Sequence, residues 1–97
     1  MGRLQMYIDG IWRDSLKTRE IINPATSEVL AQVAEGKRQD AKDGIKAARQ
    51  AFDSSNWSEL DVETRANYLE KIADQIEAHE DELAKIETLN NGKTLAE

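Results

Sequence analysis

The sequence contains no cysteine, and that absence removes several kinds of chemistry at once. Without a thiol the chain has no disulfide framework, no thiolate metal site and no cysteine nucleophile. A single histidine leaves little room for a histidine metal cluster or a serine–histidine triad. Aromatic residues are also few and far apart, which argues against a platform for stacking nucleic-acid bases. We therefore predict no catalytic residue within these 97 positions. No G-x-G-x-x-G motif occurs either, so we predict no cofactor-binding residue.

Positive charge and long apolar runs are scarce as well. The net charge is −6, and the basic residues are scattered, so a nucleic-acid partner is not expected. No stretch approaches the roughly 20 apolar residues of a membrane span, and the N-terminal residues lack the apolar core of a signal peptide. With 39% apolar and 33% charged residues, the composition is that of a folded chain rather than a disordered one. We expect one domain at most, in the cytoplasm, without a membrane partner.

The first third of the chain has the patterns of extended structure, with strands expected within about 6–34. Asp9-Gly10 separates two β-prone runs and predicts a tight hairpin turn, because both central positions of a type I′ turn need positive φ. The run 20–22 stops at Asn23-Pro24, where proline ends strand pairing. The next run, 29–34, is almost continuously apolar, which is typical of a strand covered on both faces.

Three helices are expected after these strands, over about 37–53, 61–79 and 80–91. The apolar residues change there from a period of two to a helical period. Gly36 and Asp61 are the expected N-caps, and Gly92 is the expected left-handed residue after the last helix. The apolar stripes are Ala41, Ile45, Ala48 and Phe52, then Leu69, Ile72, Ala73 and Ile76, then Leu83, Ile86 and Leu89. The expected fold class is α+β, a hairpin and strand followed by three helices, without a linker that would divide 1–97 into domains.

Three features could carry chemistry, and each has a simpler explanation. Gly92-Lys93-Thr94 resembles the end of a phosphate-binding loop, but the earlier glycine of that motif is replaced by Glu87 and a helix precedes it. His79 ends the second helix, where an imidazole can meet the last carbonyls. The acidic run 70–87 has the spacing of a solvated helix face rather than of a calcium loop.

The order of motifs along the chain carries more information than any one of them. The series is Tyr7-Ile8-Asp9-Gly10-Ile11-Trp12, then Ile22-Asn23-Pro24-Ala25-Thr26-Ser27, then Ala47-Ala48-Arg49-Gln50-Ala51-Phe52, then Ile72-Ala73-Asp74-Gln75-Ile76-Glu77, and finally Glu87-Thr88-Leu89-Asn90-Asn91-Gly92-Lys93-Thr94. From about Met6 to Glu97 it resembles the N-terminus of the NAD(P)-dependent aldehyde dehydrogenase superfamily. The betaine and general aliphatic aldehyde dehydrogenases are the most similar group.

The resemblance implies that the chain is the peripheral N-terminal part of a Rossmann-like cofactor domain. Such enzymes oxidise an aldehyde to a carboxylic acid through a cysteine thiohemiacetal and pass hydride to NAD or NADP. Their reactive cysteine and cofactor contacts lie beyond position 97, so this segment alone is expected to bind no cofactor and to be inactive. The implied partners are the remainder of the chain and further copies of it, in a dimer or tetramer.

The resemblance also implies a structural sodium or potassium ion. In the family it is held partly by main-chain carbonyls before the Asn-Pro pair and by a residue near the end of the third helix. The corresponding residues here are Ile21, Ile22 and Asn90, and asparagine replaces the usual aspartate. A neutral amide oxygen can still ligate a hard cation, with one negative charge fewer.

Two other interpretations remain open at this point. The chain could be a helical interaction or regulatory module derived from such an enzyme, or a non-enzymatic structural fragment. The third apolar run and the alanine-rich helix face need covering on more sides than 97 residues supply, which favours a segment that packs against more protein.

Overall fold

In the computed structural model of the chain, Asp9 and Gly10 form the turn that the sequence predicts, with φ of 54° and 75°. The turn joins β2 (Met6–Ile8) to β3 (Ile11–Arg13) in an antiparallel pair. Tyr7 lies opposite Trp12 in this pair, and their ring centroids are 4.7 Å apart. The predicted hairpin is therefore confirmed, and its register brings two of the few aromatic rings together.

A separate three-stranded sheet contains β1 (Gly2–Leu4), β4 (Lys17–Ile22) and β5 (Val29–Glu35), in the order β1-β5-β4. β5 is central, antiparallel to β4 and parallel to β1. The sequence did not predict β1, because three residues have no periodicity of their own. Its pairing with a strand almost 30 residues away creates it, and the terminal ammonium donates to the Leu30 carbonyl at 2.7 Å.

Asn23 organises the turn between β4 and β5 and is one of only two buried residues. Its main-chain N–H donates to the Glu28 carbonyl at 2.9 Å, and its carbonyl accepts from Ser27 at 2.8 Å. Its side-chain Oδ1 accepts from the Ala25 N–H at 2.9 Å, as in an Asx turn. The other buried residue is Ala31, at the centre of β5. The sequence predicts a β5 that is covered on both faces, but Ala31 is the one residue of this strand that is buried.

The helices are α1 (Arg38–Ser54), α2 (Val62–Ala78) and α3 (Glu80–Asn91), with a 3-10 turn, η1 (Trp57–Glu59), before α2. Gly92 has φ of 83° after α3, as predicted. The prediction of Gly36 as the N-cap of α1 was wrong, because Lys37 takes that position. The Asp40 side chain accepts from the Lys37 N–H at 2.8 Å, so the helix begins one residue later. None of the helices is both long and apolar enough to cross a membrane.

Asp61 caps α2, since its Oδ1 accepts from the Thr64 N–H at 2.8 Å. The pKa of Asp61 is lowered, chiefly because hydrogen bonds from the Thr64 side chain and main chain stabilise the carboxylate, with help from the charge of Arg65. A lowered folded pKa adds helix stability above the unfolded value, about 3.9, and this contribution is lost as pH falls through the folded pKa.

We therefore expect Asp61→Ala to lower the helix content of a peptide spanning 57–79 at neutral pH, and to have progressively less effect below about pH 4. Circular dichroism across a pH series measures this. Asp61→Ser is the matched control, because serine caps a helix without a titrating carboxylate. An effect of Asp61→Ala that is equally large at neutral and acidic pH would contradict this role.

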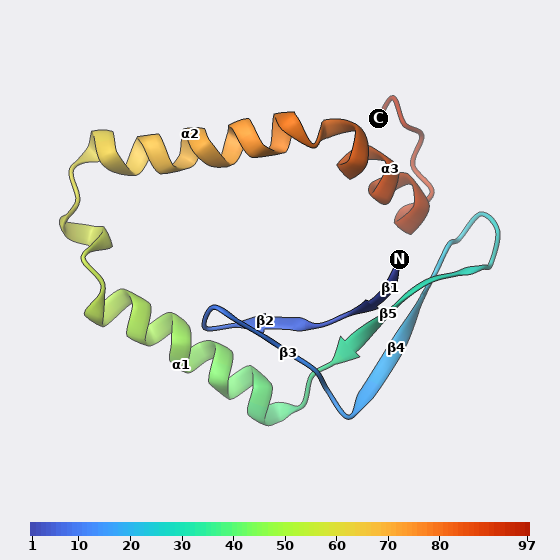
Figure 1. Ribbon diagram of the computed structural model, residues 1–97, viewed down its shortest axis with the longest axis horizontal. Helices are drawn as coiled ribbons and strands as arrows, with labels where there is room; N and C mark the ends of the chain where they lie inside the picture. Colours follow the sequence, from blue (N-terminus) through green and yellow to red (C-terminus); the bar gives the residue numbers. More distant parts are fainter.

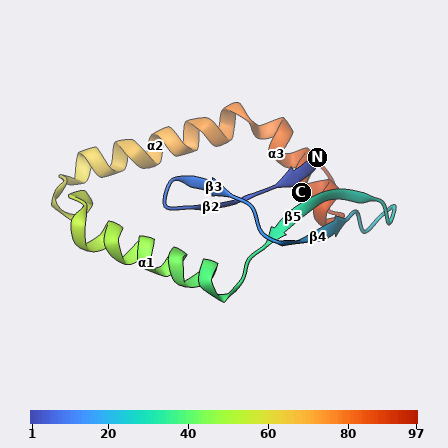
Figure 2. The same cartoon turned by 60° about the horizontal axis from the view of Figure 1, so that its bottom comes forward.

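The elements are spread out rather than gathered around a core. α1 and α2 run along two sides of the molecule, and the β2–β3 hairpin lies between them (Figures 1 and 2). The radius of gyration is 17.3 Å, against about 12.5 Å for a compact domain of this length. The accessible surface is 8113 Å², against about 5,600 Å² for a compact monomer of this mass. Most apolar side chains of the helices are therefore exposed, uncovered by the rest of the chain.

Candidate functional site

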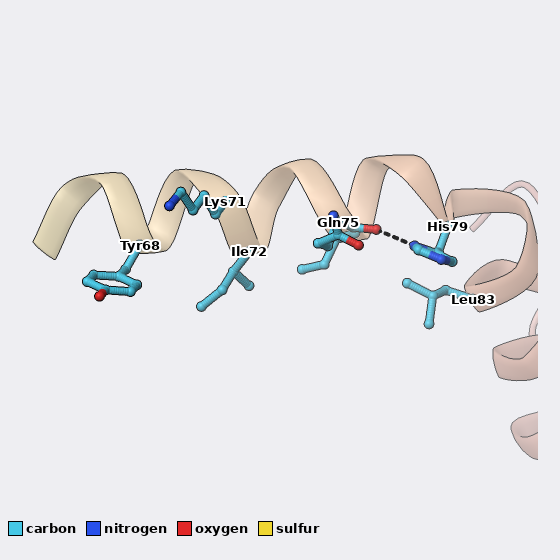
Figure 3. Close-up of a pocket in the computed structure, with 7 residues that line it drawn as sticks. Tyr68, Lys71, Ile72, Gln75, His79 and Leu83 are labelled. Atoms are coloured by element: carbon cyan, nitrogen blue, oxygen red, sulfur yellow. Dashed lines mark hydrogen bonds between the residues drawn. The ribbon is translucent and has the colours of Figure 1, made fainter. Parts of the chain in front are cut away.

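The largest uncovered feature is an apolar groove along α2 that continues onto the start of α3 (Figure 3). Its volume is about 560 Å³, and it is lined by Tyr68, Lys71, Ile72, Gln75, Ile76, His79 and Leu83. Ile72 and Ile76 are each 56% exposed. Three of the lining side chains can ionise, Tyr68, Lys71 and His79, but no hydrogen bond joins any two of them. The rest of the lining is mainly apolar, which suits a packing surface.

Both ends of this groove are held by specific contacts. At one end the ring centroids of Trp57 and Tyr68 lie 5.4 Å apart. The Lys71 ammonium lies 5.7 Å from the centroid of the same Tyr68 ring. At the other end His79 Nδ1 lies 2.8 Å from the Gln75 carbonyl, as expected for an imidazole at a helix C-terminus (Figure 3). Leu83 of α3 lies next to His79 and extends the apolar lining past the junction of the two helices.

A second uncovered face lies on α1, where Ile45 is 71% exposed and Phe52 is 73% exposed. The Arg49 guanidinium lies 4.9 Å from the centroid of the Phe52 ring. Arg49 also makes two hydrogen bonds to the Asp53 carboxylate, at 3.0 and 2.6 Å. The predicted apolar stripe is thus present on one helix face, but nothing in the chain covers it.

Arg13 joins the hairpin to α1 through two carboxylates that sequence analysis did not single out. Its Nη1 lies 2.9 Å from Asp43 and 3.2 Å from Asp40. The hydrogen bond to Asp43 raises the pKa of Arg13, and the same bond lowers the pKa of Asp43. The partners are about 30 residues apart in sequence, so no local pattern could have paired them. The cluster joins the β2–β3 hairpin to the first turns of α1.

The candidate cation residues lie near one end of the molecule. Ile21 pairs with Ala31 and Ile22 pairs with Val29, so the register shifts between the two isoleucines. Such a bulge leaves one strand residue outside the regular ladder. At the end of α3, a Cβ on Gly92 would lie 3.5 Å from Pro24 Cγ, so this helix end packs against the turn that follows β4. The structure thus places the segment carrying Asn90 beside the segment that follows Ile21 and Ile22.

The candidate donors at this end are neutral oxygens. No group of three His, Cys, Asp or Glu side chains that could hold a metal ion exists in the chain. Asn90 is exposed, and Ile21 and Ile22 could contribute only main-chain carbonyls. Neutral oxygen donors suit a hard cation of low charge better than a transition metal.

These features describe an α+β segment with exposed apolar faces. Residues 12–97 match the model of the aldehyde dehydrogenase family, and the chain belongs to this family. It corresponds to the N-terminal segment of such enzymes, as the order of motifs predicts.

Relatives of known identity agree with this assignment. Aldehyde dehydrogenase 1 of Tanacetum cinerariifolium is 46% identical over 91 residues, which is 92% of this chain and 18% of that protein. Betaine aldehyde dehydrogenase of Bacillus subtilis is 46% identical over 94 residues, or 95% of this chain and 19% of the relative. The chain thus spans less than a fifth of the length of these relatives.

The fold is the same in solved enzymes of the family. A betaine aldehyde dehydrogenase from Staphylococcus aureus, solved in complex with NAD+, superimposes with a TM-score of 0.89 and 48% identity, over 96% of this chain and 19% of that one. An aldehyde dehydrogenase from Bacillus cereus gives a TM-score of 0.90 and 43% identity over 97% of this chain. The predicted fold class is therefore confirmed, and the open arrangement of the elements matches that of a segment within a larger enzyme.

Proposed function

We propose that this chain forms the peripheral N-terminal part of the cofactor-binding domain of an NAD(P)-dependent aldehyde dehydrogenase that oxidises an aldehyde to a carboxylic acid. The observation that carries the proposal is the set of uncovered apolar faces on a chain that spans less than a fifth of its relatives. Its partners would be the remainder of the enzyme, which covers those faces, and further copies in a dimer or tetramer. A free-standing helical module is disfavoured, because only two residues of the chain are buried.

The chemistry would reside in residues other than these. The family's covalent step needs a cysteine thiolate, and the chain has none. Its role would be to support the domain that binds NAD or NADP, and the NAD+ complex of the Staphylococcus aureus relative makes NAD the first cofactor to test. A cytoplasmic location stays a prediction, since the relatives include enzymes named mitochondrial as well as enzymes from Bacillus subtilis.

We expect the separated 97-residue chain to give no aldehyde-dependent NADH formation, because the covalent step has no nucleophile. A polypeptide that contains this chain together with a complete catalytic domain should give it. The measurement is NADH absorbance with a panel of aliphatic aldehydes and betaine aldehyde, with either nicotinamide cofactor. Turnover by the separated chain, or no turnover by the longer polypeptide with any aldehyde, would refute the proposed function.

The monovalent cation site is part of the same proposal. Main-chain carbonyls of Ile21 and Ile22 and the side-chain oxygen of Asn90 would hold sodium or potassium, together with donors from the rest of the enzyme. Its support is the contact between the Gly92 turn and Pro24, which holds the two donor segments at one end of the molecule. The ion would tie the end of α3 to the end of β4.

In the longer polypeptide, we expect the melting temperature to be higher in potassium chloride than in choline chloride. Asn90→Asp should widen this difference in melting temperature, because a carboxylate binds the ion more strongly than an amide. Asn90→Ala should abolish the difference. Saturating a site at 100-fold above Kd stabilises by about 2.7 kcal/mol, so the loss is measurable by calorimetry. Asn67→Ala on α2 is the matched control. Equal cation dependence in all four proteins would exclude Asn90 as a ligand.

A further inference from the structure

Asn91 and Gly92 form the only Asn-Gly pair in the chain. An asparagine side chain places an amide carbon within five-membered-ring distance of the next main-chain nitrogen. A following glycine has no Cβ to obstruct that approach and gives the backbone the freedom to reach it. On sequence alone, this peptide is the most susceptible in the chain to loss of the side-chain amide.

The end of α3 holds the Gly92 nitrogen and both polar atoms of the Asn91 side chain in hydrogen bonds. The Asn91 side-chain nitrogen donates to Glu87 Oε1, one helical turn earlier. Its side-chain oxygen accepts from the Lys93 N–H at 2.9 Å. The Gly92 nitrogen, which would be the nucleophile, donates to the Thr88 carbonyl at 3.0 Å. Ring closure requires the Gly92–Thr88 bond to break, and the bonds to Glu87 and Lys93 hold the Asn91 side chain in place, although Asn91 itself is exposed to water.

We propose that Asn91–Gly92 is a deamidation site, and that the hydrogen bonds in the last turn of α3 slow its reaction in the folded protein. When that turn frays, the Gly92 nitrogen forms a bond to the Asn91 side-chain carbonyl carbon. The carbon–nitrogen bond of the side-chain amide breaks, and the proton from the Gly92 nitrogen leaves with it as ammonia. Water then opens the cyclic imide to aspartate or isoaspartate, and no redox partner is needed. The rate of modification thus reports how often the end of α3 opens.

The product would act on the structure around it. An aspartate at 91 adds negative charge at the C-terminus of a helix, which the helix dipole disfavours. It also lies four residues from Glu87, where like charges repel. Isoaspartate lengthens the backbone next to Gly92, which lies beside Pro24. Modification would therefore loosen the contact between the end of α3 and the turn after β4.

The test uses the longest polypeptide that contains this chain, incubated in mildly alkaline buffer, with peptide mapping that resolves aspartate and isoaspartate at position 91. We expect native protein to deamidate at least about tenfold more slowly than protein in urea, since the hydrogen bond from the Gly92 nitrogen must open and two more hold the Asn91 side chain in place. Glu87→Ala should raise the native rate several-fold and leave the rate in urea unchanged. Glu77→Ala on α2 is the matched control.

Three outcomes would overturn the proposal. They are equal rates in native and denatured protein, no deamidation in either state, and a Glu87→Ala rate equal to that of the Glu77→Ala control. The readout is a mass and a chromatographic position rather than enzyme activity, so the result stands whether or not the polypeptide oxidises aldehydes.

Discussion

Separated from other protein, the 97-residue chain will not unfold as a cooperative monomer. It exposes 8113 Å², about 2,500 Å² more than a compact monomer of its mass would expose. Part of this excess is apolar, including Phe52, Ile45 and Ile72. Apolar surface of this extent favours association or partial unfolding, because burial of such surface is the main source of folding free energy.

The measurements are sedimentation velocity across a concentration series and a thermal melt followed by circular dichroism. We expect species larger than a monomer, or a broad melt without a pretransition baseline, together with binding of a dye that reports exposed apolar surface. A longer polypeptide that contains the same residues serves as the reference and should melt cooperatively. A monomeric chain with a sharp, concentration-independent transition would contradict the interpretation of these faces as packing surfaces.

The second prediction is that Ile72→Asp will have opposite effects in two contexts. In the longer polypeptide the α2 groove is covered under our proposal, so a carboxylate there would be buried without a partner. Loss of a buried isoleucine costs about 2–5 kcal/mol, and an unpaired charge adds to that, so the variant should melt far below the parent or fail to fold. In the separated chain Ile72 is 56% exposed, and the same charge should reduce association.

Asn67→Asp is the matched control for this pair of measurements. It adds the same charge to α2, on the face opposite the apolar stripe, and Asn67 is exposed. We expect a change within about 0.5 kcal/mol in the longer polypeptide, as for surface substitutions generally. If Ile72→Asp is tolerated there as well as Asn67→Asp is, the α2 groove remains open to solvent in the enzyme and the proposed packing is wrong.

Several local features of the fold could be predicted because their causes lie within a few residues. Asp9-Gly10 and Gly92 adopt positive φ, which only a few residue types accept readily. Asp61 caps α2 because its carboxylate reaches a main-chain N–H three residues later. These positions are determined by short-range sterics and hydrogen bonding, so the residue type alone indicates the structure.

Other features could not be predicted, because their causes lie far apart in sequence. β1 exists only through its pairing with β5. Arg13 contacts Asp40 and Asp43 because the fold brings the hairpin beside α1. The N-cap of α1 is Lys37 rather than the predicted Gly36, because the Asp40 side chain accepts from the Lys37 N–H. The candidate cation residues came from family resemblance, and periodicity would not have connected Ile21 with Asn90.

The sequence by itself determined the hairpin, the three helices and the positions of the turns between them. The order of its motifs also determined the family. Only the tertiary structure decided that the helices pack little against the sheets and that the whole chain buries two residues. The tertiary structure also placed the end of α3 beside Pro24. It showed that the side chain of Asn91 is held by hydrogen bonds at that helix end. The physical reason is that backbone preferences act over a few residues, whereas burial and charge pairing depend on which distant segments the fold brings together.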